Sequence, residues 1–258
     1  GTVFNQLNAL IIGKAYTTAD LAYYTQGNKI PDLVNNNINS SLSAVLFPAF
    51  SLSNDIEEIK RIRRKCLMIM GYVLFPLMFG MIAVADKMII VLMTEKWLPA
   101  VPFVRISCIA AVIGVFGTTL IQEIKAIGRS DVTLKIELLK KTIYIIIAII
   151  AIRYGIEAIA WTLVIREIIA FCFNVYPVRN YIGFDFLIYI RDALPSLIMS
   201  MIMLISIIFL DRLIKNNALC LTVQILVGGI IYIILSAISK NESFIYLKDI
   251  LKHKIIRG

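Results

Sequence analysis

Residues 193–210 read ALPSLIMSMIMLISIIFL, an apolar run that decides the fold. A second run, ALCLTVQILVGGIIYIILSAI at 218–238, follows after a short connector. A helix needs about 20 apolar residues to cross the hydrocarbon core of a bilayer. In lipid, only helices and closed barrels satisfy every backbone polar group. The two runs therefore predict a pair of membrane-spanning helices.

Further apolar stretches of similar length lie upstream of this pair, at residues 66–85, 98–126, 132–152 and 156–177. The whole chain is 59% hydrophobic and 17% charged, with a mean hydropathy of +0.84. Soluble domains are roughly 45–50% apolar. The composition and the spacing together predict an all-α fold, a polytopic transmembrane helix bundle.

The segment 21–50 is too polar to be recognised as a span by hydropathy, yet its apolar residues recur at helical spacing. A polar face lies opposite them, and a crossing helix tolerates such a face only against protein or a water-filled cavity. An extramembrane surface helix is the alternative interpretation. With a crossing here, the topology is seven complete spans after one truncated span, because 2–12 is too short to cross. We therefore expect the sequence to begin inside a helix.

Basic residues are concentrated in every second connector. The connectors at 55–65, 125–141, 179–191 and 240–257 carry 5, 5, 2 and 5 of the 26 Lys and Arg residues. The positive-inside rule predicts that these connectors, and with them the C-terminus, are cytoplasmic. The net charge of +9 is thus mostly juxtamembrane, which favours anionic lipid headgroups as partners and argues against nucleic acid. The four cysteines form no CxxC pair and no metal-ligand spacing.

Two charged residues, Arg166 and Glu167, lie at the centre of the stretch 156–177. Adjacent helical residues point about 100° apart, so we expect them to face different partners. Arg166 shares a stripe with Thr162 and Asn174 that is suited to line a cavity. A structural ion pair between Arg166 and Glu123 is an equally strong interpretation. The sequence also predicts snorkelling lysines in the stretch 132–152 and an i, i+4 pair of Glu137 with Lys141.

Four sets of motifs carry a resemblance to a known family. They are AYY at 22–24 with IP at 30–31 and VLFPAFS at 45–51; EKWLPAVP at 95–102; AIGRSD at 126–131 with KIE at 135–137; and YGIEAIA at 154–160. Their order and spacing resemble the Wzx-like polysaccharide flippases (for O-antigen and other lipid-linked oligosaccharides) of the multidrug/oligosaccharidyl-lipid/polysaccharide exporter superfamily. The resemblance extends over residues 10–183.

The resemblance implies two six-helix lobes. Residues 1–182 are expected to form the second lobe, with its first helix truncated, and residues 183–258 a C-terminal two-helix hairpin and basic cytoplasmic tail. The missing N-terminal lobe of the same protein is then a partner. Such flippases move isoprenoid-diphosphate-linked oligosaccharide from the cytoplasmic to the outer leaflet of the bacterial inner membrane, by alternating access without ATP hydrolysis. A polysaccharide polymerase and glycosyltransferases are the further partners implied.

Asn and Ser side chains can hydrogen-bond sugar hydroxyls, and basic side chains can hold a diphosphate. The predicted cavity residues are Arg166, Asn28, Lys29, Asp32, Asn35, Asn36, Asn39, Thr162, Asn174 and Glu123.

The sequence contains no Walker A motif, Gly-rich phosphate loop or metal cluster, so no cofactor is predicted. A membrane enzyme needs sizeable extracytoplasmic loops, whereas the connectors 13–20, 94–97, 153–155 and 211–217 are short. We therefore expect a transporter for surface polysaccharide or lipopolysaccharide biosynthesis and not an enzyme. Two alternatives stay open: an ion-coupled drug or cation antiporter of the same superfamily, and a flippase for a lipid-linked peptidoglycan precursor.

Overall fold

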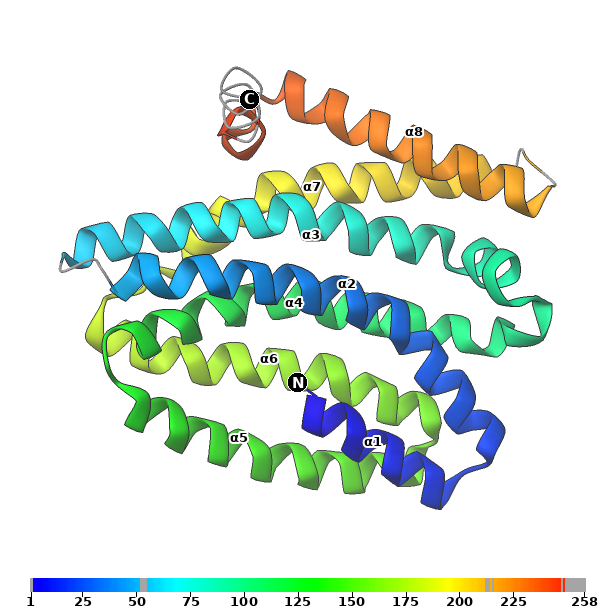
Figure 1. The fold of residues 1–258 in the computed structure, drawn as a ribbon, viewed down its shortest axis with the longest axis horizontal. Coiled ribbons are helices and arrows are strands. Elements are labelled where there is room, and N and C mark those ends of the chain that lie inside the picture. The colour runs from blue at the N-terminus through cyan, green and yellow to red at the C-terminus, as the bar shows by residue number, and fades with distance from the viewer. Residues whose placement is uncertain (1, 52–54, 212–213, 215, 247, 249–258) are drawn as a thin grey trace.

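The computed structural model describes residues 2–51, 55–211, 214, 216–246 and 248, and these residues form helices and no strand (Figure 1). The all-helical fold predicted from the sequence is therefore confirmed. The long helices are α1 (Thr2–Ala15), α2 (Thr18–Ser51), α3 (Ile56–Met93), α4 (Val101–Ala126), α5 (Ser130–Ala151), α6 (Ile156–Tyr181), α7 (Phe186–Asp211) and α8 (Asn217–Ile238). Short 3₁₀ turns, η1 (Glu95–Ala100) and η2 (Ile152–Tyr154), precede α4 and α6.

The predicted spans all coincide with helices, including the polar segment 21–50, which lies within the 34-residue α2. By length and composition, four helices of the described chain can cross a membrane: Ile56–Met93, Glu95–Lys125, Phe186–Asp211 and Asn217–Ile238. The long helices outside this set, α2, α5 and α6, carry amides or charges near their centres. Whether α2, α5 and α6 also cross the membrane stays a prediction, and so does the total of seven complete spans after a truncated one.

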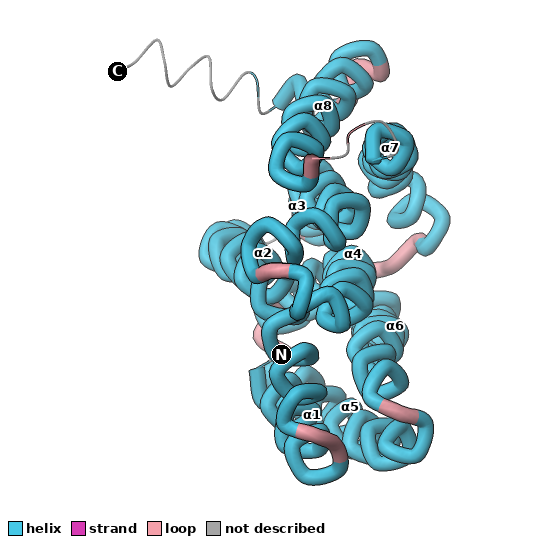
Figure 2. Tube along the Cα trace, turned by 90° about the vertical axis from the view of Figure 1, so that its right-hand side faces the viewer, coloured by secondary structure: helices cyan, strands magenta, loops and turns pink. Residues whose placement is uncertain are grey.

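Helices that follow one another in the chain run in opposite directions, so that α2, α4 and α6 point one way and α3, α5 and α7 the other (Figure 1). Helix α4 lies in the middle and packs against α2, α3 and α6, while α5 packs on α6 and the short α1 lies beside α2 (Figure 2). The largest apolar core joins α3, α4 and α7, and a smaller one joins α1, α4 and α6. The turns α4–α5 and α6–α7 and the end of α8 lie at the end of the bundle where α3 begins (Figure 1). This is the end that carries the basic connectors.

Helix α2 approaches α4 closely because Gly27 has no side chain. A Cβ at Gly27 would lie 2.6 Å from the Ala100 carbonyl oxygen and 2.7 Å from Phe103 Cβ. One turn earlier, the rings of Tyr24 and Phe103 meet edge to face, with centroids 5.7 Å apart. Tight packing at this end of α2 fixes the direction in which its next residue, Asn28, points.

The α7–α8 hairpin packs along α3. Near one end of α3, Arg64 Nε lies 3.0 Å from Asp192 Oδ1; near the other, Lys87 Nζ lies 3.6 Å from Asp211 Oδ1. Between them, the Tyr232 hydroxyl donates to the Tyr72 carbonyl at 2.8 Å. The predicted boundary between residues 182 and 183 falls in the α6–α7 turn, and the division into two domains stays a prediction.

Candidate functional site

Helices α2, α4, α5 and α6 surround a cavity of about 730 Å³. Each helix contributes one face, and the faces differ in chemistry. Helix α2 contributes amides, α4 contributes small side chains, and α5 and α6 contribute charges. A cavity of this size and polarity sits in a bundle whose outer helix faces carry many exposed Leu and Ile side chains.

The α2 wall is the polar face that the sequence predicted. Six residues at helical spacing point into the cavity: Thr25, Asn28, Asp32, Asn35, Asn36 and Asn39. Asn39 Nδ2 donates to Asn35 Oδ1 at 2.7 Å. Asn28 is only 5% exposed, and its Oδ1 accepts no hydrogen bond from the part of the chain that the structure describes. The wall therefore combines exposed amides with one buried amide oxygen whose hydrogen-bonding capacity is not used within the described residues.

The α4 floor consists of small residues, which the sequence reasoning missed. Ser107, Ala110, Ala111, Gly114, Gly117 and Thr118 line the cavity. The signal was available, because these residues recur at i, i+3, i+4, i+7, i+10 and i+11 within an apolar stretch. A Cβ at Gly114 would lie 3.2 Å from Glu167 Oε2, so bulk here competes with the opposite wall for space.

Arg166 and Glu167 line the cavity and bind each other. Arg166 Nε and Nη2 lie 3.1 and 2.9 Å from Glu167 Oε1. The expectation that adjacent residues face different partners was therefore wrong. Their Cα–Cβ bonds do diverge by about 100°, but the long guanidinium side chain bends back across the helix surface to reach the carboxylate.

Lys140 is a second cation of the cavity wall and, unlike Arg166, it is buried, with an exposed fraction of only 3%. Its ammonium pairs with Glu137 and donates to Asn174 Oδ1 at 3.2 Å. Asn174 Nδ2 in turn donates to the Gly117 carbonyl at 3.1 Å, which ties α5, α6 and α4 together. Snorkelling is therefore wrong for Lys140, because the ammonium is buried and is satisfied by Glu137 and Asn174. Glu137 pairs with Lys140 and not with Lys141, which lines the cavity nearby.

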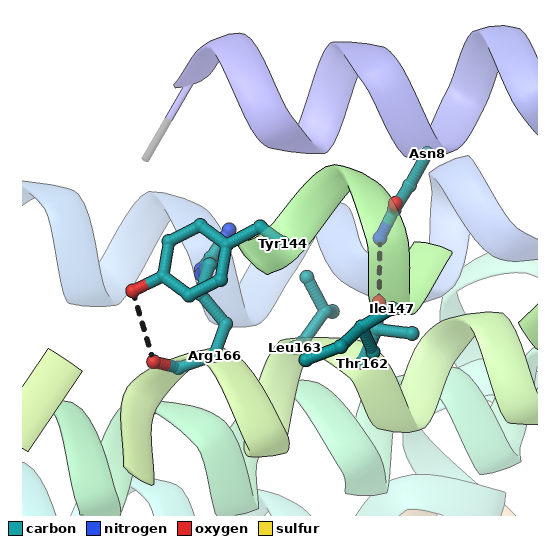
Figure 3. Close-up of a pocket in the computed structure, with 6 residues that line it drawn as sticks. All are labelled: Asn8, Tyr144, Ile147, Thr162, Leu163 and Arg166. Carbon is teal, nitrogen blue, oxygen red and sulfur yellow. Dashed lines mark hydrogen bonds between the residues drawn. The ribbon is translucent and has the colours of Figure 1, made fainter. Parts of the chain in front are cut away.

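Thr162 lies beside the main cavity, in a small pocket that it shares with Arg166 (Figure 3). Asn8 Nδ2 of α1 donates to Thr162 Oγ1 at 3.1 Å, and the Tyr144 hydroxyl of α5 donates to the Arg166 carbonyl at 3.2 Å. Of the predicted stripe, Arg166 and Asn174 line the main cavity. Thr162 instead binds α1 to α6 through its hydrogen bond with Asn8.

Glu123 and Lys29 do not line the cavity. Glu123 Oε2 lies 3.1 Å from Arg63 Nη1 of α3, so the proposed pair with Arg166 is not formed. Ile121 of α4 lines the cavity, and Glu123, two residues on, is rotated by about 200° toward α3. Lys29 is exposed, one position beyond the buried Asn28. In the described part of the chain, no cluster of His, Cys, Asp or Glu is suited to hold a metal ion.

Comparisons with known proteins give a consistent result. Residues 1–102 match the protein family described as "Polysaccharide biosynthesis protein". The lipopolysaccharide biosynthesis protein WzxC of Escherichia coli (strain K12) is 26% identical over 109 residues, which is 42% of this chain and 22% of WzxC. The succinoglycan biosynthesis transport protein ExoT of Rhizobium meliloti is 21% identical over 261 residues, 93% of this chain and 50% of ExoT.

A solved structure, the lipid II flippase MurJ in an inward closed conformation, has a similar fold, with a TM-score of 0.76 at 21% identity. The likeness covers 96% of this chain and 52% of MurJ. The chain therefore spans about half the length of ExoT and of MurJ. Together, the matches confirm the resemblance to Wzx-like polysaccharide flippases, membrane transporters of polysaccharide biosynthesis.

Proposed function

We propose that this chain forms part of a transporter that flips isoprenoid-diphosphate-linked oligosaccharide from the cytoplasmic to the outer leaflet for surface polysaccharide assembly. The polar cavity of about 730 Å³ carries the proposal. Binding pockets for small molecules are about 300–1,000 Å³, so the cavity has room for a few sugar rings of a headgroup. The lipid tail would stay in the bilayer, against the apolar outer faces of the helices.

The two walls suit the two parts of this headgroup. The amides of Asn35, Asn36 and Asn39 can exchange hydrogen bonds with sugar hydroxyls, because an amide both donates and accepts. Arg166 and Lys140 can hold the diphosphate through charge-assisted bonds. The small side chains of α4 leave the space between the walls open.

The transport cycle is proposed to be alternating access without ATP hydrolysis. In the full-length protein an N-terminal lobe closes the cavity against the lobe described here, and rocking of the two lobes moves the opening from one leaflet to the other. The basic end of the bundle, with the C-terminus, is proposed to face the cytoplasm of a bacterium, with the helices in the inner membrane. Glycosyltransferases then supply the substrate and a polymerase consumes it.

A flippase for a lipid-linked peptidoglycan precursor is the second candidate. The fold likeness to MurJ favours it, and the same walls suit its sugar and diphosphate chemistry. A cation antiporter has less support, because the cavity lining holds as many cations as carboxylates.

Replacing Arg166 with Gln in the full-length protein tests the proposal. The matched control is Arg153→Gln, because Arg153 is exposed in the turn before α6 and lies outside the cavity. In a strain that lacks its own copy, Arg166→Gln should lower surface polysaccharide by roughly tenfold or more, equivalent to about 1.4 kcal/mol. Protein level should stay normal, and Arg153→Gln should behave as wild type.

Normal surface polysaccharide staining in the Arg166→Gln strain, at normal protein level by immunoblotting and without accumulation of a peptidoglycan precursor, would overturn the assignment of this cavity. Normal surface polysaccharide combined with accumulation of a peptidoglycan precursor in the Arg166→Gln strain would support the second candidate.

A further inference from the structure

We propose that Glu137 and Glu167 are resident counter-ions, which hold the cavity cations Lys140 and Arg166 when no substrate is bound and compete with the substrate's anionic group for them. This inference rests on the proposed function, and it concerns how that site selects and releases its ligand. Neither glutamate was singled out by the sequence as a residue that faces the substrate.

The cavity is formally neutral. Its lining holds three carboxylates, Asp32, Glu137 and Glu167. It also holds three cations, Lys140, Lys141 and Arg166. An entering anion therefore does not meet a net positive charge. To bind Lys140 or Arg166, it must take the place of the carboxylate that is already bound to that cation.

All four paired residues line the cavity, and their exposure differs between the two pairs. The Lys140 side chain is 4% exposed, whereas that of Glu137 is 37% exposed. The Arg166 and Glu167 side chains are exposed to similar extents, 16% and 24%. Lys140 therefore lies deeper in the wall than its glutamate, whereas Arg166 and Glu167 both border the cavity. At either site, a ligand anion competes with the glutamate carboxylate for the same cation.

Both pairs join residues of one helix, at i, i+3 in α5 and at adjacent positions in α6. Exchange of the glutamate for a ligand anion therefore needs a side-chain rotation and no helix movement. When the ligand leaves, the tethered carboxylate returns at once. The cations are then never left without a partner in a medium of low dielectric, where a bare charge is costly.

This arrangement also favours ligands of high charge. A monovalent anion only exchanges one single negative charge for another, so it gains little binding free energy. A diphosphate brings several negative oxygens into the same cavity and can engage more than one cation. The resident glutamates therefore select against chloride and free carboxylates, and they weaken the binding of the intended headgroup enough for it to be released.

Binding of inorganic pyrophosphate to the purified full-length protein, measured by titration calorimetry, tests the inference. Glu167→Gln and Glu137→Gln should each bind pyrophosphate at least tenfold more tightly than wild type, about 1.4 kcal/mol. Both variants should also gain affinity for chloride. The matched control is Glu157→Gln, which removes the same charge from an exposed position at the start of α6 and should leave both affinities unchanged.

Unchanged or weaker pyrophosphate binding in both glutamate variants overturns the inference, and thermal unfolding identifies any variant that is not folded. Because the two variants lie on different helices, pyrophosphate binding can still be measured in one of them if the other fails to fold. If Arg166→Gln abolishes export while neither glutamate variant binds more tightly, the counter-ion inference fails and the proposed function stands. If Arg166→Gln exports normally and no variant binds pyrophosphate, the proposed function fails as well.

Discussion

Two of the arginine–glutamate pairs in the described part of the chain, Arg63 with Glu123 and Arg166 with Glu167, differ in almost every respect. Arg63 and Glu123 join α3 to α4, and the Glu123 side chain is completely buried. Arg63 also donates to the Gly183 carbonyl at 3.3 Å and lies over the Phe184 ring, 5.6 Å from its centroid. Arg166 and Glu167 belong to one helix, and both remain partly exposed to the cavity.

The difference indicates two separate roles for the same chemistry. A pair between helices holds a fixed distance, and its loss leaves a charge buried without compensation. A pair within one helix fixes no distance between elements, so its members are free to exchange partners. Placement on the helix surface decides which role a charge takes, and the cavity face of α4 ends before Glu123.

The strongest way to test this contrast is to break the pair in the core. Arg63→Met should destabilise the protein by about 3–5 kcal/mol, because the Glu123 carboxylate then stays buried without its partner. We expect protein level and thermal stability in detergent to fall, and export to fall with them. The double variant Arg63→Met/Glu123→Leu should recover most of the stability, and a stable single variant would show that the pair is dispensable.

A second test leaves both ion pairs intact and fills the space between the walls. Thr118→Trp places a large ring on the α4 floor and should lower export by roughly tenfold or more, about 1.4 kcal/mol. Thr222→Trp is the matched control, since both hydroxyls donate to the carbonyl four residues earlier at 2.9 Å. Thr222 is exposed on α8, outside the cavity. Equal export by the two variants would argue against passage through this cavity.

The smallest loss of export is expected from changes in the α2 wall, where several uncharged amides each contribute a part of the binding. Asn36→Ala removes one neutral hydrogen-bonding group, worth about 0.5–1.5 kcal/mol, and should lower export by roughly two- to twelvefold. Asn37→Ala is the control, because Asn37 is exposed and does not line the cavity. A radiolabelled export assay that ranks Asn37→Ala below Asn36→Ala would contradict the proposed orientation of α2.

The sequence predicted the helices and the polar face of α2, because both depend on periodicity along a single segment. It placed Asn28, Asp32, Asn35, Asn36 and Asn39 together, and the structure shows all five on one cavity wall.

Partners across helices were harder to predict. The assignment of Glu123 to Arg166 failed because hydropathy does not indicate which face of α4 meets α3. Lys140 was not predicted to line the cavity because lysines of the stretch 132–152 were expected to snorkel, and only the three-dimensional structure reveals that Asn174 accepts a hydrogen bond from it. The small floor of α4 could have been recognised from its spacing alone.

Helix α3 contacts the α7–α8 hairpin through two ion pairs, and the length of α3 sets the distance between them. Its residues Arg64 and Lys87 hold the two ends of α7, at Asp192 and Asp211. At 1.5 Å per residue these two anchor points are about 35 Å apart along α3. Inserting or deleting one residue between them would turn one anchor by about 100° away from its partner. The interval of α3 between Arg64 and Lys87 is therefore fixed in length, and this stretch of the chain should accept substitutions far more readily than changes in length.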